Sequence, residues 1–509
     1  MSKFFKILTA AFLLMAMIGC EEERQLPTPE FNRYNQDNTF YSQVLGRDVH
    51  YAILFPENYR EEKDVRYPVV YMLQGYGESK VGGRDWSKWV SKIKVLEALG
   101  LEPMIYVFPD CKNSYYSNSY DGKNMYMDMF VDELVPYVDN SFRTIADRDH
   151  RAVMGYSMGG FGAMVLPMKN PDVFGISVPL SISVRTDEQY MNESQDGWNN
   201  QWGSIFGGKG QNGYGRITDY YKEHSPFYQF TAANHETLSR VKWFMHCGDD
   251  EEQILIANDN LHVLMRDNGY EHEFRISDGG HDGDYWRNAA GETLPWISHV
   301  MNGGGEWTKI TGTITTSYAD LDEDGTFASK GYKEAETKDG IAIYFAYKNI
   351  DASILEKMMR LIGKVKSNIQ YMILPCDLTV KTLAEWMEEY KGKFEVGKEL
   401  AKSHVIAIGE AGREAYELQD EFSVFYFHNA DLAEDETTIT ADASKWYYID
   451  QTDDSENYRD MHALYRACMK SINGDVDNSN FEYRMRNGVS DIEQTLLYVA
   501  KGIADNFQK

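Results

Sequence analysis

The sequence is poor in basic residues for its length and contains few cysteines. Its 509 residues include 51 lysines and arginines against 79 aspartates and glutamates, which gives a formal net charge of −28. This charge disfavours a nucleic-acid partner, because binding to phosphates requires a basic surface, and it also disfavours electrostatic docking onto anionic lipid. Hydrophobic residues make up 43% and charged residues 26%, which is typical of a folded globular protein.

Four of the five cysteines form no CxxC pair and no metal-ligand spacing: Cys111, Cys247, Cys376 and Cys468. Each lies in or beside an apolar segment, so we expect buried, unpaired thiols and no metal site. Residues 320–325 resemble the start of a calcium loop, but Gly331 stands where a bidentate glutamate is needed. We therefore interpret this segment as a solvated acidic turn.

The fifth cysteine, Cys20, follows a basic start and an apolar run over residues 7–18 that is too short to span a bilayer comfortably. The run ends at Met17-Ile18-Gly19-Cys20, which resembles a bacterial lipoprotein cleavage box. This resemblance implies a signal peptide over residues 1–19, a lipid anchor on Cys20 and a place at the outer membrane of the cell envelope. A plain secretory signal is the alternative.

The acidic stretch after Cys20 looks like the export tag of surface lipoproteins in Bacteroidetes-type bacteria. Residues 20–37 are polar and contain prolines, which is typical of a tether.

From residue 38 onward, short apolar segments alternate with segments of helical spacing, as a mostly parallel α/β sheet requires. We expect helices over Met127–Val138 and Leu294–Met301. The expected strands are Val49–Phe55, Tyr67–Leu73, Met104–Phe108, Lys242–Cys247 and Glu273–Ile276. Three glycines at 303–305 then mark a boundary, so we expect one domain over 38–302. We expect a linker over 303–339, with a peripheral strand as the alternative for this stretch.

The feature that indicates chemistry is Gly155-Tyr156-Ser157-Met158-Gly159, which lies between an apolar strand and a helix-compatible segment. In this setting a serine is held on a strained turn with its hydroxyl exposed. Glycines suit the flanks because the strand and helix backbones pass close to the turn. A serine hydroxyl becomes nucleophilic only beside a base, which an acid orients, and the expected chain order is serine, acid, histidine.

The best candidate for the base is His281, since it lies in a glycine-rich loop directly after a predicted strand. The acid is expected on the loop after the Lys242 strand. Four carboxylates are available there: Asp249, Asp250, Glu251 and Glu252. One would hold the imidazole tautomer and three would be solvated surface charges, and the residues themselves leave the choice open.

An ordered set of segments carries a resemblance to a known family: Tyr67–Gly77, Pro109-Asp110, Gly155–Gly160, Cys247–Asp250 and Asp278–His281. The chain resembles the Putative esterase family, which includes esterase D (S-formylglutathione hydrolase) and the feruloyl and acetylxylan esterases of carbohydrate esterase family 1. The resemblance covers about residues 38–302 and implies an α/β-hydrolase fold.

The same resemblance implies a role for each matching residue. Ser157 would be the nucleophile and His281 the general base. The family position of the acid falls on Glu251, with Asp250 kept as an alternative because the family usually has aspartate and this loop carries an extra residue. The backbone N–H groups of Tyr76 and Met158 would form the oxyanion hole, and no metal or organic cofactor is needed.

Residues 340–509 repeat the plan of the first domain. Echoes of its segments occur in the same order at Ile341–Ala346, Tyr371–Asp377, His404–Gly412, Lys445–Tyr448 and Glu482–Met485. In this alignment Ala411 faces Ser157, Ser490 faces His281, and Asp454 faces Glu251. We therefore predict a degenerate hydrolase-like domain without catalytic residues. An unrelated α/β domain with similar apolar strands is the alternative.

These observations together predict a lipid-anchored serine esterase that removes feruloyl or acetyl groups from plant polysaccharide or oligosaccharides. An esterase or thioesterase for another small acyl substrate, like esterase D or siderophore esterases, is one alternative, and an inactive glycan-binding lipoprotein is another. Aromatic residues near the expected pocket would suit stacking on a sugar or phenolic group, or would be core residues: Trp86, Trp89, Tyr115, Tyr116, Tyr120 and those of the insertion 195–221.

Overall fold

The computed structural model describes residues 32–78, 86–303, 327–328, 341–350, 371–393, 403–452, 455–472 and 481–486. The predicted signal peptide, Cys20, the acidic turn at 320–325, Asp454 and Ser490 lie outside these residues. Within the described ranges, no helix is both long enough and apolar enough to cross a membrane.

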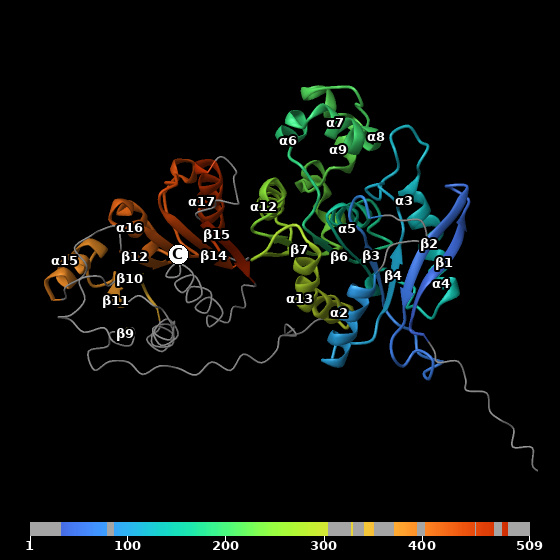
Figure 1. Ribbon diagram of the computed structural model, residues 1–509, viewed down its shortest axis with the longest axis horizontal. Coiled ribbons are helices and arrows are strands. Elements are labelled where there is room, and N and C mark those ends of the chain that lie inside the picture. Colours follow the sequence, from blue (N-terminus) through green and yellow to red (C-terminus); the bar gives the residue numbers. More distant parts are fainter. Residues whose placement is uncertain are drawn as a thin grey trace, which may run out of the picture.

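The described strands join in one 15-stranded sheet with the order β1-β2-β4-β3-β5-β6-β7-β8-β15-β14-β13-β12-β10-β11-β9 (Figure 1). Most neighbours are parallel; the pairs β1–β2, β2–β4, β8–β15 and β9–β11 are antiparallel. The strands are β1 (Tyr34–Ser42), β2 (Arg47–Leu54), β3 (Val69–Leu73), β4 (Ile105–Pro109), β5 (Arg151–Tyr156), β6 (Ile176–Leu180), β7 (Lys242–Gly248), β8 (Glu273–Ser277), β9 (Phe327–Ala328), β10 (Ile341–Tyr347), β11 (Tyr371–Asp377), β12 (His404–Ile408), β13 (Val424–His428), β14 (Trp446–Thr452) and β15 (Phe481–Arg486).

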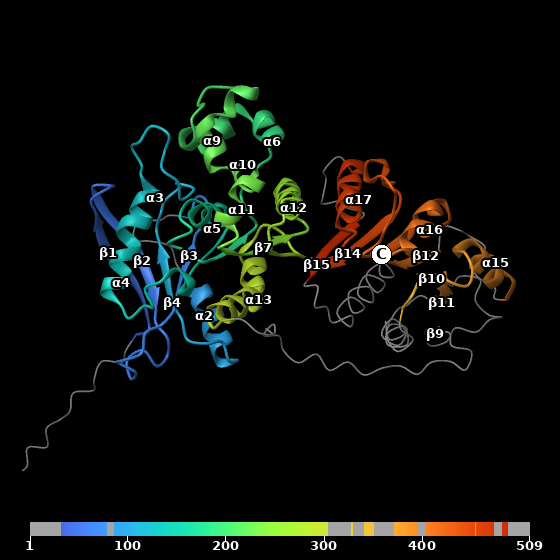
Figure 2. The same cartoon turned by 180° about the vertical axis from the view of Figure 1, so that it is seen from behind.

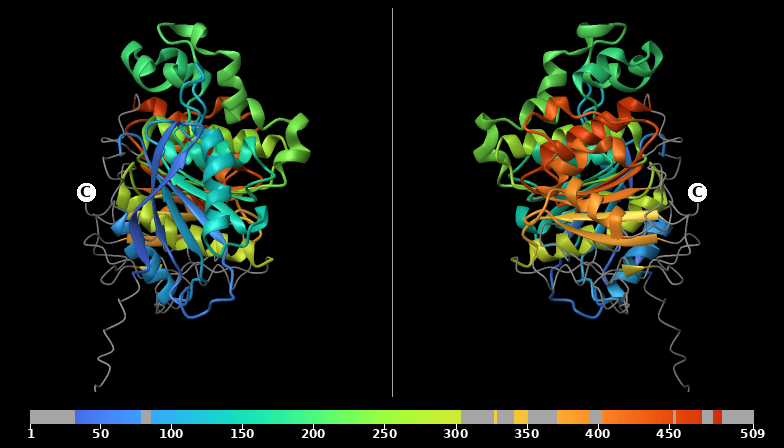
Figure 3. Two further views of the ribbon diagram at one scale, coloured as in Figure 1. Left: turned by 90° about the vertical axis from the view of Figure 1, so that its right-hand side faces the viewer. Right: turned by 90° about the vertical axis from the view of Figure 1, so that its left-hand side faces the viewer.

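Helices connect the parallel strands and cover both faces of the sheet. The principal helices are α2 (Ser87–Ala98), α4 (Val135–Ser141), α5 (Met158–Lys169), α6 (Asp187–Asn192), α9 (Asp219–His224), α12 (Glu252–Asp267), α13 (Gly283–Met301), α15 (Leu383–Lys393), α16 (Ala411–Glu417) and α17 (Tyr458–Ser471). Shorter helices are α3 (Tyr126–Asp128), α7 (Gln195–Gly197), α8 (Gly203–Phe206), α10 (Pro226–Gln229) and α11 (His235–Leu238). Figure 3 looks along the sheet from its two ends, with β1 in front in one view and the strands around β11 in front in the other.

We call the described residues from 32 to 303 the first unit and those from 327 to 486 the second unit. The strands at the centre of the first unit are buried on both faces, which explains their nearly continuous apolar sequences. Every residue of β3, β4, β5 and β6 is buried. Side chains of α2 and α13 pack against one face, in a cluster that contains Trp89 and Trp286. Side chains of α5 and α12 pack in the cluster on the other face, with Phe161 and Leu261 among them.

The strand order of the first unit recurs in the second. The first unit runs β2-β4-β3-β5-β6-β7-β8 and the second runs β9-β11-β10-β12-β13-β14-β15, with an antiparallel outer strand in both. This repeated order is the arrangement that a duplicated α/β unit requires. The duplication, and the loss of chemistry in the second copy, stay predictions from the sequence.

The hydrogen bonds change one detail of the predicted alignment. Ser157 has φ 57°, and its N–H donates to Leu180 O at 3.0 Å. In the second unit Gly409 has φ 55°, and its N–H donates to His428 O, also at 3.0 Å. The structure therefore places Gly409, and not Ala411, where the first unit has Ser157. Ala411 begins α16.

The two units meet through corresponding elements. β8 and β15, the last strands of the two units, pair antiparallel at Ile276 and Met485, each of which follows a Glu-x-Arg sequence. The helices α12 and α17 precede these strands and are also in contact, with His462 hydrogen-bonded to Asp259. Because corresponding residues contact each other, the two units meet as the subunits of a two-fold symmetric dimer do.

Some predicted boundaries are wrong. β1 begins at Tyr34, so the tether predicted for residues 20–37 overlaps a strand. The last helix of the first unit begins at Gly283 and not at Leu294. Residues 327–328 lie in the stretch predicted to be a linker or a peripheral strand, and they form β9. The strands β1, β6 and β13 were not predicted.

The buried imidazole of His404 predicts an acid-sensitive second unit. Burial lowers the pKa of His404 from 6.5 to about 3, so this side chain binds a proton in the unfolded chain but not in the folded one. Its contribution to stability is complete above pH 6.5 and decreases as the pH falls. We expect it to remove about 2 kcal/mol of stability between pH 7 and pH 5. Urea unfolding at both pH values measures the change in the free energy of unfolding between pH 7 and pH 5. This change should be smaller for His404→Leu than for the parent, and equal changes would contradict the prediction.

Candidate active site

Ser157 occupies a sharp turn between β5 and α5. It follows the last residue of β5 directly and is the N-cap of α5, with φ 57° and ψ −119°. A positive φ is unfavourable for a residue with a Cβ and persists only where the surrounding structure enforces it. The enforcing contacts come from the end of β6 and the segment that follows it: Leu180 O accepts from Ser157 N, and Ser183 N donates to Ser157 O at 3.1 Å.

The glycines around Ser157 are required by close backbone contacts. A Cβ added to Gly155 would lie 2.4 Å from the carbonyl oxygen of Gly159. A Cβ on Gly159 would lie 2.2 Å from the carbonyl oxygen of Leu73, and one on Gly160 would lie 2.4 Å from that of Leu180. The motif therefore brings the start of α5 against the ends of both β3 and β6.

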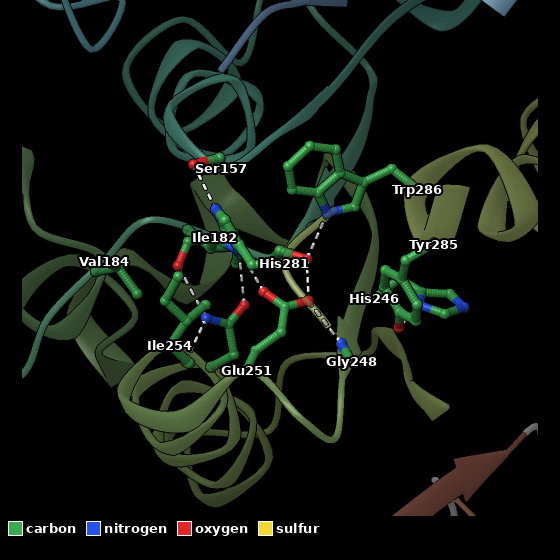
Figure 4. Close-up of polar contacts among 12 residues, drawn as sticks. Ser157, Ile182, Val184, His246, Gly248, Glu251, Ile254, His281, Tyr285 and Trp286 are labelled. Atoms are coloured by element: carbon green, nitrogen blue, oxygen red, sulfur yellow. Dashed lines mark hydrogen bonds and ion pairs between the residues drawn. The ribbon is translucent and has the colours of Figure 1, made fainter. Parts of the chain in front are cut away.

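His281 lies between Ser157 and Glu251 (Figure 4). Its Nε2 is 2.9 Å from Ser157 Oγ, and its Nδ1 is 2.6 Å from Glu251 Oε2. A carboxylate can only accept, so Nδ1 carries a hydrogen that it donates to Glu251. In the neutral ring Nε2 is then the acceptor for the hydroxyl of Ser157.

Glu251 is held by further contacts on its second oxygen. Oε1 accepts from the backbone N–H of Gly248 at 2.9 Å and from the hydroxyl of Ser181 at 2.5 Å. The hydroxyl oxygen of Ser181 in turn accepts from Trp286 Nε1 at 2.8 Å. The side chain of Glu251 is fully buried. These donors satisfy the carboxylate and fix the oxygen that faces His281.

The other carboxylates of this loop do not take that position. Asp250 is exposed, and its backbone N–H donates to Gly279 O at 3.2 Å. Asp249 is buried and forms an ion pair with Arg484 of the second unit, so the prediction that it is a solvated charge is wrong. Glu252 is the first residue of α12. The structure therefore brings Glu251, and not Asp250, to the imidazole.

In the loop after β3, the backbone N–H of Tyr76 lies between two backbone N–H groups that already donate hydrogen bonds. Gly75 N donates to Glu78 Oε2 and Gly77 N donates to Asn113 Oδ1, both at 2.8 Å. In the part of the chain that the structure describes, the N–H of Tyr76 has no acceptor. Met158 is the first residue of α5, so its N–H has no acceptor within that helix.

Most of the aromatic residues considered for the pocket belong to the core. Trp86, Trp89, Tyr115 and Tyr116 are all buried, and so are the two tryptophans of the insertion 195–221. Of the candidates, Tyr120 and Tyr214 are exposed, at 61% and 72%, and Tyr76 on the loop after β3 is 39% exposed. The insertion forms a helical cap that includes α7, α8 and α9 and stands above the sheet (Figure 2).

Sequence reasoning missed several residues that support this geometry. Ser181 has φ 46° directly after β6, a strand that was not predicted. Trp286 stacks on Tyr156 with ring centroids 4.3 Å apart, and it forms a T-shaped contact with His281 with ring centroids 5.0 Å apart. Glu78 binds both Gly75 N and the hydroxyl of Tyr156. The residues next to each of these positions in the sequence give little indication of these contacts, because the contacts join segments that are distant in the chain.

Residues 42–297 match the family described as Putative esterase, which is half of the chain. The chain belongs to this family. The match includes Ser157, Glu251 and His281, and it ends within α13. The first unit has the α/β-hydrolase fold.

Individual relatives match parts of this chain. An esterase of Mycobacterium tuberculosis (strain CDC 1551 / Oshkosh), MT1326, is 33% identical over 135 residues, which are 25% of this chain and 27% of that protein. An endo-1,4-beta-xylanase/feruloyl esterase of Xylanibacter ruminicola is 30% identical over 147 residues, 28% of this chain and 20% of that protein. The alignments thus span about a quarter of these relatives' length. A solved ferulic acid esterase is 27% identical, with a TM-score of 0.43, and the match covers 52% of this chain and 96% of that one.

The close contact at Gly159 predicts that one methyl group added at this position destabilises the protein. In Gly159→Ala the new Cβ would clash with Leu73 O, a backbone atom that cannot rotate away. We expect the free energy of unfolding to fall by about 1–3 kcal/mol, with a lower melting temperature. Gly215→Ala is the matched control, since its Cβ would approach only the flexible side chain of Gln211, at 3.0 Å. Thermal unfolding followed by circular dichroism compares the two variants; equal melting temperatures would contradict the prediction.

Proposed function

We propose that the protein is a serine esterase that removes feruloyl or acetyl groups from plant polysaccharide or its oligosaccharides. The observation that carries this proposal is the chain of hydrogen bonds from Ser157 through His281 to the buried Glu251. This order of nucleophile, base and orienting acid is the one that acyl transfer by a serine requires.

In the proposed reaction Ser157 Oγ attacks the ester carbonyl while His281 Nε2 takes its proton. Glu251 stabilises the imidazolium that forms and keeps its ring in place. The backbone N–H groups of Tyr76 and Met158 donate to the oxyanion of the tetrahedral intermediate. His281 then returns the proton to the leaving alcohol, and a water molecule, activated by the same histidine, releases the acid and restores Ser157.

The substrate class is supported by the names of two similar proteins and by the surface near the oxyanion loop. One relative is named a xylanase/feruloyl esterase and one solved structure a ferulic acid esterase. The exposed ring of Tyr76 lies on the loop that carries the proposed oxyanion donor. A phenolic acyl group could stack on such a ring, whereas an acetyl group needs no aromatic contact.

We further propose that Cys20 is lipidated and holds the esterase at the outer membrane, where it would face polysaccharide outside the cell. The sequence pattern before Cys20 and the acidic residues after it support this location. The test is metabolic labelling with a fatty acid: label is expected in the parent protein and is expected to disappear in Cys20→Ala.

Hydrolysis of model esters tests the central proposal. The parent should hydrolyse p-nitrophenyl acetate and methyl ferulate, while Ser157→Ala should lose at least about 10³-fold in kcat because the nucleophile is gone. Equal rates for the two proteins would exclude Ser157 as the nucleophile. Binding of xylan by a parent that turns over neither ester would favour a glycan-binding role instead.

The geometry also predicts which carboxylate matters for turnover. Glu251→Gln keeps the shape of the side chain but offers His281 an amide, so we expect kcat to fall by about 10²–10⁴-fold. Asp250→Asn is the matched control on the same loop, and its kcat should stay within about two-fold of the parent's, since exposed substitutions away from the site have small effects. Steady-state kinetics with p-nitrophenyl acetate decides between them, and the reverse ranking would assign the acid to Asp250.

A further inference from the structure

The loop that carries Glu251 and the loop that carries His281 are in direct backbone contact. Asp249 N donates to Ser277 O at 3.1 Å, and Asp250 N donates to Gly279 O at 3.2 Å. A Cβ added to Gly248 would lie 2.1 Å from Gly279 O, so the two loops pack too closely for any residue larger than glycine at this position. The relative position of acid and base therefore depends on how these two loops are joined.

One carboxylate closes this junction. Asp249 Oδ1 accepts from the backbone N–H of Gly279 at 3.1 Å. Asp249 lies two residues before Glu251, and Gly279 lies two residues before His281. A single side chain thus ties the segment that positions the acid to the segment that positions the base.

The counter-charge of Asp249 comes from the second unit. Arg484 on β15 donates through Nη1 to Asp249 Oδ2, and both side chains are about 95% buried. Figure 1 shows β15 at the junction of the two units, near β7 and α12. Burial raises the pKa of Asp249, and the guanidinium of Arg484 opposes that rise. Among the described residues, Glu482 and Asp278 also face Arg484, at 2.8 Å and 3.9 Å from Nη2, and Arg484 Nη1 donates to Tyr483 O at 3.1 Å.

The corresponding arginine of the first unit is Arg275 on β8. It pairs with Glu292 at 2.8 Å and with Glu273 at 2.5 Å, both within its own unit.

We propose that Arg484 is a positioning residue for catalysis, through which the second unit holds the acid and base loops of the first unit in register. The inference rests on the proposed function for its effect on turnover. Arg484 touches no reacting atom and acts through Asp249. Removal of its charge would leave Asp249 buried beside Asp278, weaken the tie to Gly279 and let His281 move relative to Ser157.

The test compares Arg484→Gln with Arg484→Lys and with a matched control, Arg459→Gln. Arg459 forms an ion pair with Asp267 across the same junction, but both side chains are partly exposed and belong to α17 and α12. Steady-state kinetics with p-nitrophenyl acetate measures kcat and KM. Hydrogen exchange followed by mass spectrometry measures the protection of the peptide that spans residues 277–283, independently of any activity.

We expect Arg484→Gln to lower kcat by about 10–100-fold with KM within about three-fold of the parent's, since misplacement of a catalytic group mainly affects turnover. The 277–283 peptide should exchange faster in this variant. Arg484→Lys should recover most of kcat, because it restores a cation beside Asp249, and Arg459→Gln should match the parent in both measurements.

Unchanged exchange of the 277–283 peptide in folded Arg484→Gln, or a kcat within two-fold of the parent's, would overturn the proposal. If Arg484→Gln does not fold, Asp249→Asn decides by the same criteria, because it removes the charge that Arg484 binds. A parent without esterase activity would contradict the proposed function, and the exchange data would still show whether Arg484 holds the loop.

Discussion

The backbone conformation of Ser157 is the constraint on which the rest of the site depends. A serine at φ 57° is strained, and it is kept there by a helix that starts against two strand ends at distances that leave no room for a Cβ at Gly155, Gly159 or Gly160. Its N–H bonds to the last residue of β6, and its carbonyl group bonds to the segment that follows this strand. The hydroxyl is thus fixed by the sheet itself, and the loops that carry His281 and Glu251 need only be placed relative to a rigid point.

Much of the fold was predictable because buried parallel strands have continuous apolar sequences. β3, β4, β5, β7 and β8 were all located from this pattern. The pattern failed at β1, which has several exposed polar residues, and at β6, whose five residues include a serine and a proline. The equivalence of Gly409 and Ser157 depends on hydrogen bonds between strands, so an alignment from the amino-acid sequence alone matched Ala411 to Ser157 instead.

The site was predictable to the extent that its chemistry is local in sequence. The sharp turn at Ser157 and the glycine-rich loop of His281 can each be recognised from a short sequence pattern. The choice among four adjacent carboxylates depends instead on which side chain is buried and which donors surround it, and those donors, Ser181 and Gly248, belong to two different strand ends. The role of Asp249 could not be predicted either, because its partner Arg484 lies in another unit.

The pairing of β8 with β15 has a consequence for how the chain stays soluble. An open sheet ends in strands with unused hydrogen-bonding groups, and such edges recruit other chains and promote aggregation. In this protein each unit covers the last strand of the other. Deletion of the second unit would expose β8 to its surroundings, whatever chemistry that unit has. Protection of this edge would be a reason to retain the second unit even as the copy without catalytic residues that the sequence predicts.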